Sequence, residues 1–184
     1  MKKVILTITG PSGSGKSTLE EELCRNKKFE KVISHTSRNI RSKEINGKDY
    51  HFMDRDFFFN SKKDFLEMVE FADNFYGVHK DSLNDLNINV VVVEPEGYRQ
   101  LSHYCEKKEI EHISIGLTIS KQLQKKRMLS RGDTLQNVIN RINKENISSE
   151  MNNIKFDINI NTDSISIENM KYIIYGFLFD KGVL

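Results

Sequence analysis

The sequence of 184 residues contains no tryptophan, only two prolines and only two cysteines. Cys24 and Cys105 stand far apart and neither belongs to a C-x-x-C pair, which argues against a disulfide framework and favours reduced thiols. No apolar stretch approaches the roughly 20 residues that span a membrane. The short mixed run before Gly10 is not a signal-peptide pattern. We therefore expect a cytoplasmic protein with no membrane partner.

An excess of charge of one sign is also lacking. Lys and Arg total 28, Asp and Glu total 26, and the formal net charge is +2. This near balance gives no global basic field, so we expect no nucleic-acid partner. The five histidines are scattered without metal-ligand spacing, and we assign them no chemistry.

A glycine-rich segment near the start of the chain follows the pattern G-x-x-x-x-G-K-[ST]. An apolar run at Val4–Thr9 precedes it, and a helical pattern with Leu19 and Leu23 follows. A phosphate-binding loop requires this context, because backbone N–H groups and the helix dipole then converge on phosphate oxygens. We predict an ATP-phosphate site formed by Gly10, Ser12, Gly13, Ser14, Gly15, Lys16, Ser17 and Thr18. Lys16 would bridge two phosphates, and the Ser17 hydroxyl would bind Mg²⁺.

Apolar runs and helical patterns alternate along most of the remaining chain. Strands are predicted at 3–9, 32–34, 50–53, 88–93, 112–119 and 156–160, and helices at 16–27, 97–108, 120–131, 133–152 and 166–180. Four consecutive valines at 90–93 are typical of a strand buried on both faces. This alternation predicts an α/β fold with a parallel sheet flanked by helices.

Residues 34–87 break this alternation with short elements in mixed order, and we predict an inserted lobe there. Short helices are expected from Asp54, at 62–68, where Glu67 would lie on a helix, and at 81–87. Within this lobe Arg38 and Arg41 stand three residues apart, so that two guanidinium groups can hold one phosphate. The hydroxyls of Tyr50 and Tyr76 could each donate to the same phosphate.

Several motifs together resemble the guanylate kinase family over nearly the whole chain. The segment from Ser34 through Arg38, Arg41, Glu44 and Tyr50 to Phe52 is similar to S-x-T-[TS]-R-x-x-R-x-x-E-x-x-G-x-[DH]-Y-x-F. Asn-Phe-Tyr-Gly at 74–77, the arginines around Gly132 and the Phe-Asp pair at 156–157 add to the resemblance. It implies ATP- and Mg²⁺-dependent phosphoryl transfer to GMP or dGMP.

The resemblance also implies an architecture. The five-stranded parallel core would comprise 1–33, 88–120 and 153–184, all within one domain of residues 1–184. Residues 34–87 would form a mixed α+β lobe that binds the nucleoside monophosphate, and 121–152 a helical lid.

Individual roles follow from the same resemblance. Glu67 and Glu94 would accept from N1–H and N2–H₂ of guanine, and Ser34 would approach O6. Glu44 joins Arg38, Arg41, Tyr50 and Tyr76 in the monophosphate site, and Asn161 joins the ATP site. Arg127, Arg131 and Arg141 would act with Lys16 and Arg38 in catalysis by neutralising charge as the phosphoryl group moves.

The sequence departs from the family pattern at the residues expected to contact the base. Val78 stands where the family has Thr or Ser, and Val92 and Glu94 replace the two acids of D-x-D. Magnesium coordination would then depend on Ser17, phosphates and water. These changes leave two alternatives open, which are a shifted base preference among deoxynucleoside monophosphates and a non-catalytic guanylate-kinase-like binding module.

Overall fold

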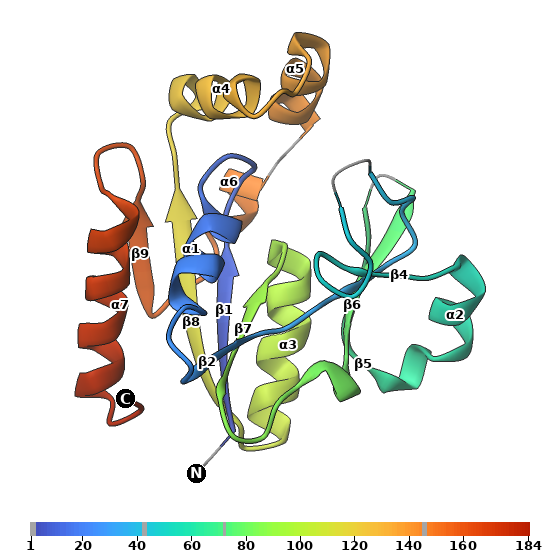
Figure 1. Ribbon diagram of the computed structural model, residues 1–184, viewed down its shortest axis with the longest axis vertical. Coiled ribbons are helices and arrows are strands. Elements are labelled where there is room, and N and C mark those ends of the chain that lie inside the picture. Colours follow the sequence, from blue (N-terminus) through green and yellow to red (C-terminus); the bar gives the residue numbers. More distant parts are fainter. Residues whose placement is uncertain (1–2, 42–43, 72, 145–146) are drawn as a thin grey trace.

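The computed structural model describes residues 3–41, 44–71, 73–144 and 147–184. Within these ranges a five-stranded sheet has the order β2-β7-β1-β8-β9, and every neighbouring pair is parallel. Figure 1 shows this sheet at the centre of the molecule. Its strands are β1 (Val4–Thr9), β2 (Phe29–Lys31), β7 (Ile88–Val92), β8 (Glu111–Thr118) and β9 (Ile158–Asn161). The predicted α/β fold with a parallel five-stranded core is confirmed.

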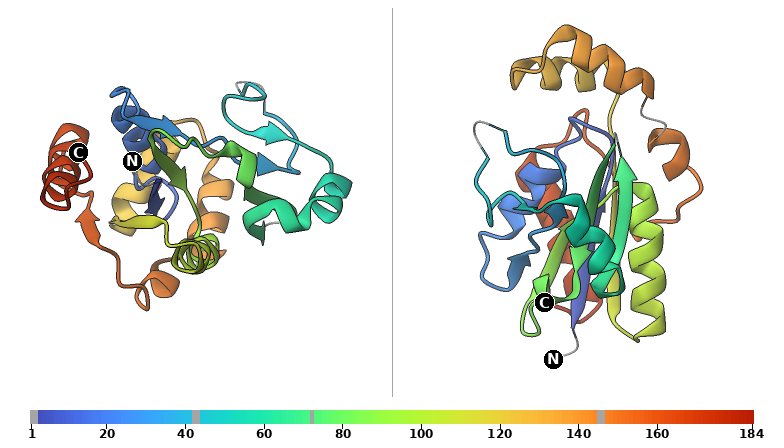
Figure 2. Two further views of the ribbon diagram at one scale, coloured as in Figure 1. Left: turned by 90° about the horizontal axis from the view of Figure 1, so that it is seen from below. Right: turned by 90° about the vertical axis from the view of Figure 1, so that its right-hand side faces the viewer.

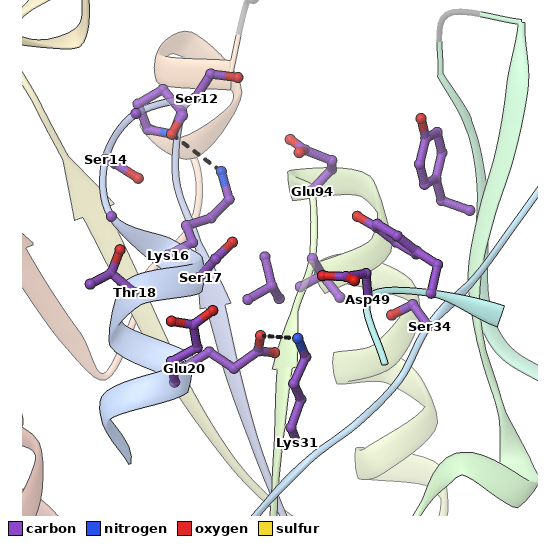
Figure 3. Close-up of a pocket in the computed structure, with 18 of the residues that line it drawn as sticks. Ser12, Ser14, Lys16, Ser17, Thr18, Glu20, Lys31, Ser34, Asp49 and Glu94 are labelled. Carbon is purple, nitrogen blue, oxygen red and sulfur yellow. Dashed lines mark hydrogen bonds and ion pairs between the residues drawn. The ribbon is translucent and has the colours of Figure 1, made fainter. Parts of the chain in front are cut away.

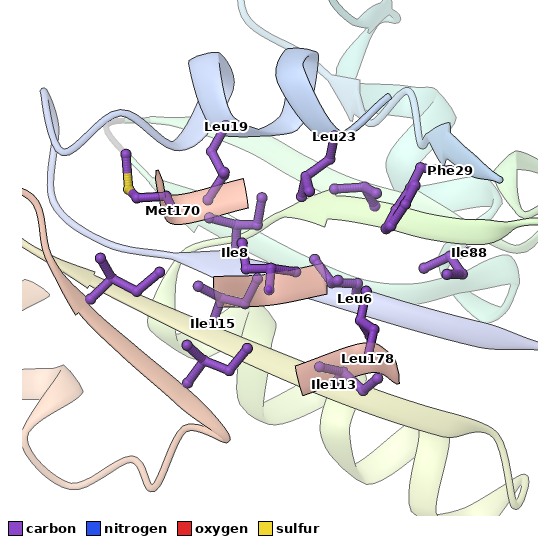
Figure 4. Packing of buried hydrophobic residues seen from close by; sticks show 14 of the residues in the cluster. Leu6, Ile8, Leu19, Leu23, Phe29, Ile88, Ile113, Ile115, Met170 and Leu178 are labelled. Atoms are coloured by element: carbon purple, nitrogen blue, oxygen red, sulfur yellow. The ribbon is translucent and has the colours of Figure 1, made fainter. Parts of the chain in front are cut away.

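Helices cover both faces of this sheet because the strands are apolar on both sides. Leu6 and Ile8 of β1 point to the face that α1 (Lys16–Leu23) and α7 (Ile167–Asp180) cover, as Figure 4 shows. Ile5, between them in sequence, belongs to a second cluster with Leu101 of α3 (Pro95–Lys107) on the opposite face. Side chains alternate between the faces of a strand, so one strand contributes to both clusters.

A smaller four-stranded sheet lies beside the first, on the side of β2 and α3 (Figure 2). Its order is β4-β3-β6-β5, with strands β3 (His35–Thr36), β4 (His51–Phe52), β5 (Phe65–Phe71) and β6 (Asn74–His79). The helix α2 (Arg55–Asn60) begins as predicted after Asp54, whose carboxylate accepts from the Phe57 N–H. Phe58 of α2 is fully buried and stacks on Phe65 and Phe75, so α2 packs against β5 and β6.

Some predicted elements of the 32–87 region are wrong. The strand lies at Phe29–Lys31 and not at 32–34, and the helix expected at 62–68 is a short 3-10 turn, Lys62–Asp64, followed by β5. Glu67 therefore lies on a strand, paired with Val78 of β6. Residues 65–71 are too short for their pattern to decide between helix and strand, and antiparallel pairing with β6 decides it. Of the helix expected at 81–87, only the 3-10 turn Lys80–Ser82 is present.

Two long helical predictions also need correction. α1 ends at Leu23 and not at 27, because the Asn26 N–H donates to the Leu23 carbonyl and the chain then turns into β2. The single helix expected over 133–152 is instead α5 (Leu135–Lys144) and α6 (Ile147–Met151), which lie in different places in Figure 1. Residues 145–146 lie outside the described ranges. α4 (Lys121–Ser130) begins after Ser120, whose Oγ accepts from the Leu123 N–H, in agreement with the start predicted at 120.

The order of the elements brings several loops together at one edge of the large sheet. The loop after β1 and Glu94, two residues after β7, both follow the carboxyl ends of neighbouring parallel strands. Open α/β sheets bind their ligands at this edge. Across the described ranges, every helix is too short or too polar to cross a membrane.

Candidate functional site

A cavity of about 740 Å³ lies at this edge, between the loop after β1 and the four-stranded sheet. Figure 3 shows Lys16 and Ser17 on its α1 side and Ser34 and Glu94 across from them. The cavity brings together most of the predicted site residues. They are Ser12, Gly13, Ser14, Gly15, Lys16, Ser17, Thr18, Ser34, Arg38, Arg41, Glu44, Tyr50, Glu67, Tyr76, Glu94, Arg127, Arg131 and Arg141.

Three predicted site residues, all within the described ranges, stay outside the cavity lining. Gly10 lies beneath the loop, where a Cβ atom would come within 2.7 Å of the Leu117 carbonyl oxygen. Asn161 is exposed at the end of β9, where its side chain accepts from the Asp163 N–H. Val78 is fully buried in the apolar cluster with Leu66 and Val93, so its side chain faces the core.

The glycine-rich loop has the backbone of an anion site. Gly13 and Gly15 adopt φ of 76° and 96°, a left-handed conformation that favours glycine. In the described chain no side chain caps the start of α1, and the buried Ser14 hydroxyl has no hydrogen-bond partner. Uncapped N–H groups at a helix start attract phosphate. The Lys16 ammonium lies over the loop and donates to the Gly10 and Pro11 carbonyls, at 2.5 and 3.2 Å.

Arg38 is held rigidly at the other side of the cavity. Its two terminal nitrogens donate to the two carboxylate oxygens of Glu44, at 3.0 and 2.7 Å. Glu44 also accepts from the backbone N–H of Arg41. Burial disfavours ionised Glu44, but the hydrogen bonds from Arg38 and Arg41 outweigh it, so the pKa of Glu44 lies below its ordinary value. The contact orients the Arg38 guanidinium, while the Arg41 side chain is 62% exposed and lies 3.9 Å from the same carboxylate.

The two predicted tyrosines stand beside this arginine. The ring centres of Tyr50 and Tyr76 are 6.1 Å apart, and the Arg38 guanidinium lies 5.7 Å from the Tyr50 ring. Burial raises the pKa of Tyr50 to about 12, so its hydroxyl keeps its proton at neutral pH. Two arginines and two phenol donors therefore surround one part of the cavity, a group suited to a phosphate.

Glu67 is deeply buried at the end of the cavity near α3, at 5% exposure. Burial raises its pKa to about 8, against a hydrogen bond from the Val78 N–H, and the charge of Glu94 raises it further. Its carboxylate lies against the first turn of α3, where a Cβ atom on Gly97 would come within 2.7 Å of Oε2. Gly97 thus leaves the room for Glu67, and two acids face one end of the cavity.

The three arginines of the predicted lid also reach the cavity. Arg127 on α4 donates to the Gly13 carbonyl at 3.3 Å and to the Thr162 carbonyl at 2.8 Å. Arg131 pairs with Asp133 at 2.6 Å, beyond the end of α4. Arg141 on α5 lines the cavity. Arg127 therefore connects α4 to the glycine-rich loop.

Sequence reasoning missed several residues of the cavity. Glu20 of α1 is buried and pairs with Lys31 of β2 at 3.4 Å. Burial raises the pKa of Glu20 to about 7, although Lys31 opposes this. The signal was an acid next to Leu19 on a helix face predicted to be apolar. Other missed lining residues include Glu21, Asp49, Ile165, Ile167 and Met170.

The donor set around Ser17 fits a magnesium ion that arrives with a nucleotide. Among the described residues no three His, Cys, Asp or Glu side chains gather into a metal site. Mg²⁺ keeps several waters and is usually bound by one or two protein oxygens together with substrate phosphates. The Ser17 hydroxyl beside the phosphate loop supplies such an oxygen.

Comparisons with known proteins find relatives that share most of this sequence's length. The guanylate kinase of Prochlorococcus marinus subsp. pastoris is 38% identical over 149 residues, which cover 77% of this chain and 78% of that protein. The guanylate kinase of Malacoplasma penetrans is 27% identical over 189 residues, covering 98% of this chain and 96% of that protein.

The fold is also found among solved structures. The crystal structure of guanylate kinase from Anaplasma phagocytophilum matches with a TM-score of 0.67 at 24% sequence identity, covering 98% of this chain and 86% of that one. The model of the family described as guanylate kinase matches residues 1–174. The chain therefore belongs to the guanylate kinase family.

Proposed function

We propose that the protein transfers the γ-phosphoryl group of ATP to GMP or dGMP and releases two diphosphates. The observation that carries this proposal is a single cavity with two phosphate-handling groups. The loop around Lys16 lies on one side, and Arg38, Arg41 and the two tyrosines lie on the other. A protein that binds one nucleotide needs only one such group.

The acceptor half would hold the monophosphate at both ends. Arg38 and Arg41, which both contact Glu44, would bind its phosphate together with the hydroxyls of Tyr50 and Tyr76. Guanine offers N1–H and N2–H₂ on one edge, and a carboxylate accepts from both. Glu67 and Glu94 supply acceptors at the other end of the cavity, and Ser34 would approach O6.

The donor half would hold the triphosphate of ATP on the glycine-rich loop. Lys16 would exchange its two loop carbonyls for phosphate oxygens, and Ser17 would bind the Mg²⁺ that accompanies ATP. When bound, this ion neutralises charge on the phosphates. Arg127, Arg131 and Arg141 would close over the phosphates, and arginines in this role contribute roughly 10³–10⁵ in rate.

Three regions of the chain would then have separate functions. Residues 34–87 would be the lobe that binds the monophosphate, 121–152 the lid, and the remainder the core. Phosphoryl transfer needs little covalent chemistry from the protein, so positioning of the two nucleotides and exclusion of water would supply most of the acceleration. The substrates of this reaction are soluble, which is consistent with a cytoplasmic protein without a nucleic-acid or membrane partner.

A coupled assay of ADP formation tests the proposal directly. The panel should contain GMP, dGMP, AMP, CMP, UMP and dTMP at equal concentration, with Mg²⁺ and ATP. We expect turnover with GMP and dGMP and very little with AMP, which has no N1–H or N2 amine for the two acids. If another monophosphate were the preferred substrate, guanine would be the wrong base. If none of them were turned over, the proposed kinase activity would be refuted.

A further inference from the structure

The acid Glu20 has no part in the function proposed so far, although it lies inside the cavity. It is 4% exposed on a helix that otherwise buries Leu19 and Leu23. Its ion-pair partner Lys31 is 3.4 Å away, longer than the roughly 2.7–2.9 Å of a strong charged hydrogen bond. Burying such a pair contributes little to stability, and apolar residues would serve the fold as well or better. The position of this carboxylate therefore calls for a functional reason.

The location of Glu20 supplies that reason. It follows Ser17 by three residues on α1, and side chains three apart share one face of a helix. Figure 3 shows Ser17 and Glu20 on the cavity side of α1, with Glu20 turned toward Lys31. Two other buried acids of the cavity have different surroundings, since Glu44 contacts Arg38 and Glu67 lies against Gly97.

The last residue of the neighbouring strand is not an acid, and Glu94, two residues further on, is assigned to the base. Val92 closes β7 and lines the same cavity, and α1 packs against this strand. A hydrated Mg²⁺ bound through phosphates and one hydroxyl needs further acceptors for the hydrogens of its waters. On the α1 side Glu20 is the buried carboxylate available for this purpose.

We propose that Glu20 is a positioning residue for magnesium, whose carboxylate accepts hydrogen bonds from water molecules bound to the ion beside Ser17. Lys31 contacts the other side of this carboxylate through the ion pair. The acid that contacts the magnesium waters would thus be Glu20 on α1, while the end of β7, where the family pattern has an acid, carries Val92. The inference rests on the proposed function, since it assumes a nucleotide and its Mg²⁺ at the loop.

Calorimetric titration with ADP, once with Mg²⁺ and once with EDTA, tests the inference without requiring turnover. The measured quantity is the factor by which Mg²⁺ increases ADP affinity. We expect Glu20→Gln to reduce this factor by about tenfold or more, because partners around a metal's ligands are worth about 10–100-fold in metal affinity. ADP affinity in EDTA should stay unchanged, since Glu20 then has no ion to position.

Three further variants separate this role from a structural one. Glu22→Gln removes the same charge from the same helix, outside the cavity lining, and breaks an ion pair with Lys171, so it should leave the factor unchanged. Lys31→Met breaks the same ion pair but keeps the acid. In this variant Mg²⁺ should still increase ADP affinity by nearly the same factor as in the unaltered protein. The double variant Glu20→Leu with Val92→Asp moves the acid to the end of β7. Its ADP affinity should again increase with Mg²⁺ as in the unaltered protein. It also covers the case in which Glu20→Gln does not fold.

Specific outcomes would overturn the inference. A full Mg²⁺ effect in folded Glu20→Gln would exclude the role, as would an equal loss in Lys31→Met, which would make the ion pair a structural contact. If the unaltered protein itself bound no ADP, the proposed function would fail instead. The two failures are therefore distinguishable in one set of titrations.

Discussion

Replacing Glu67 by glutamine should stabilise the free protein at neutral pH. Burial raises the pKa of Glu67 from 4.5 to about 8 in the folded protein, so folding requires the carboxyl to take up a proton. A pKa that is higher in the folded state gives stability that is present below pH 4.5 and is lost as pH rises toward 8. From pH 4.5 to 7 the loss spans about two and a half units at 1.36 kcal/mol each, or about 3 kcal/mol.

Glutamine carries no charge, so this pH dependence should disappear in Glu67→Gln. Its carbonyl can still accept from the Val78 N–H, and its amide can donate toward Glu94. The gain in unfolding free energy should therefore approach 3 kcal/mol at pH 7 and fall toward zero near pH 4.5. Urea unfolding at several pH values measures it, followed by circular dichroism because the chain has no tryptophan.

A control on the same strand tests whether burial is the cause. Glu70 is 52% exposed and pairs with Arg55, so Glu70→Gln should change the unfolding free energy by less than about 1 kcal/mol at any pH. If Glu67→Gln retained the pH dependence of the unaltered protein between pH 5 and 8, Glu67 would titrate normally and the reasoning would be refuted. The same variant should weaken GMP binding, because its amide presents a donor to the donors of guanine.

Three other substitutions give separate expectations. Lys16→Ala should abolish turnover and leave GMP affinity nearly unchanged in a calorimetric titration, whereas equal losses for GMP and ATP would contradict two separate sites. Arg38→Ala should weaken GMP binding by about 1.5–3 kcal/mol, the value of a charge-assisted hydrogen bond, with little effect on ADP binding in the same titration. Val78→Thr places a hydroxyl in an apolar cluster and should lower the unfolding free energy by about 1–3 kcal/mol in urea. A tighter GMP complex without that loss would instead place residue 78 in the base site.

The sequence by itself determined the parts of this protein that depend on local chemistry. The spacing of Gly10, Gly15 and Lys16 after an apolar run predicted the strand, loop and helix. Gly13 and Gly15 adopt left-handed backbone angles, which glycine adopts freely. The run of valines at 90–93 predicted a buried strand. Ser120 and Ser166 predicted helix starts, since their hydroxyls accept from the first-turn N–H groups of α4 and α7.

Tertiary structure decided what depends on partners distant in the sequence. Glu67 lies on a strand because β6 pairs with it, and its environment comes from Gly97 on α3, thirty residues later. Val78 faces the core because the alternation of β6 turns it toward α3, although its place in the motif suggested the base. The burial of Glu20 and its contact with Lys31 arise only when β2 packs beside α1. Local patterns carry no information on such contacts, because their energy belongs to pairs of elements and not to either segment alone.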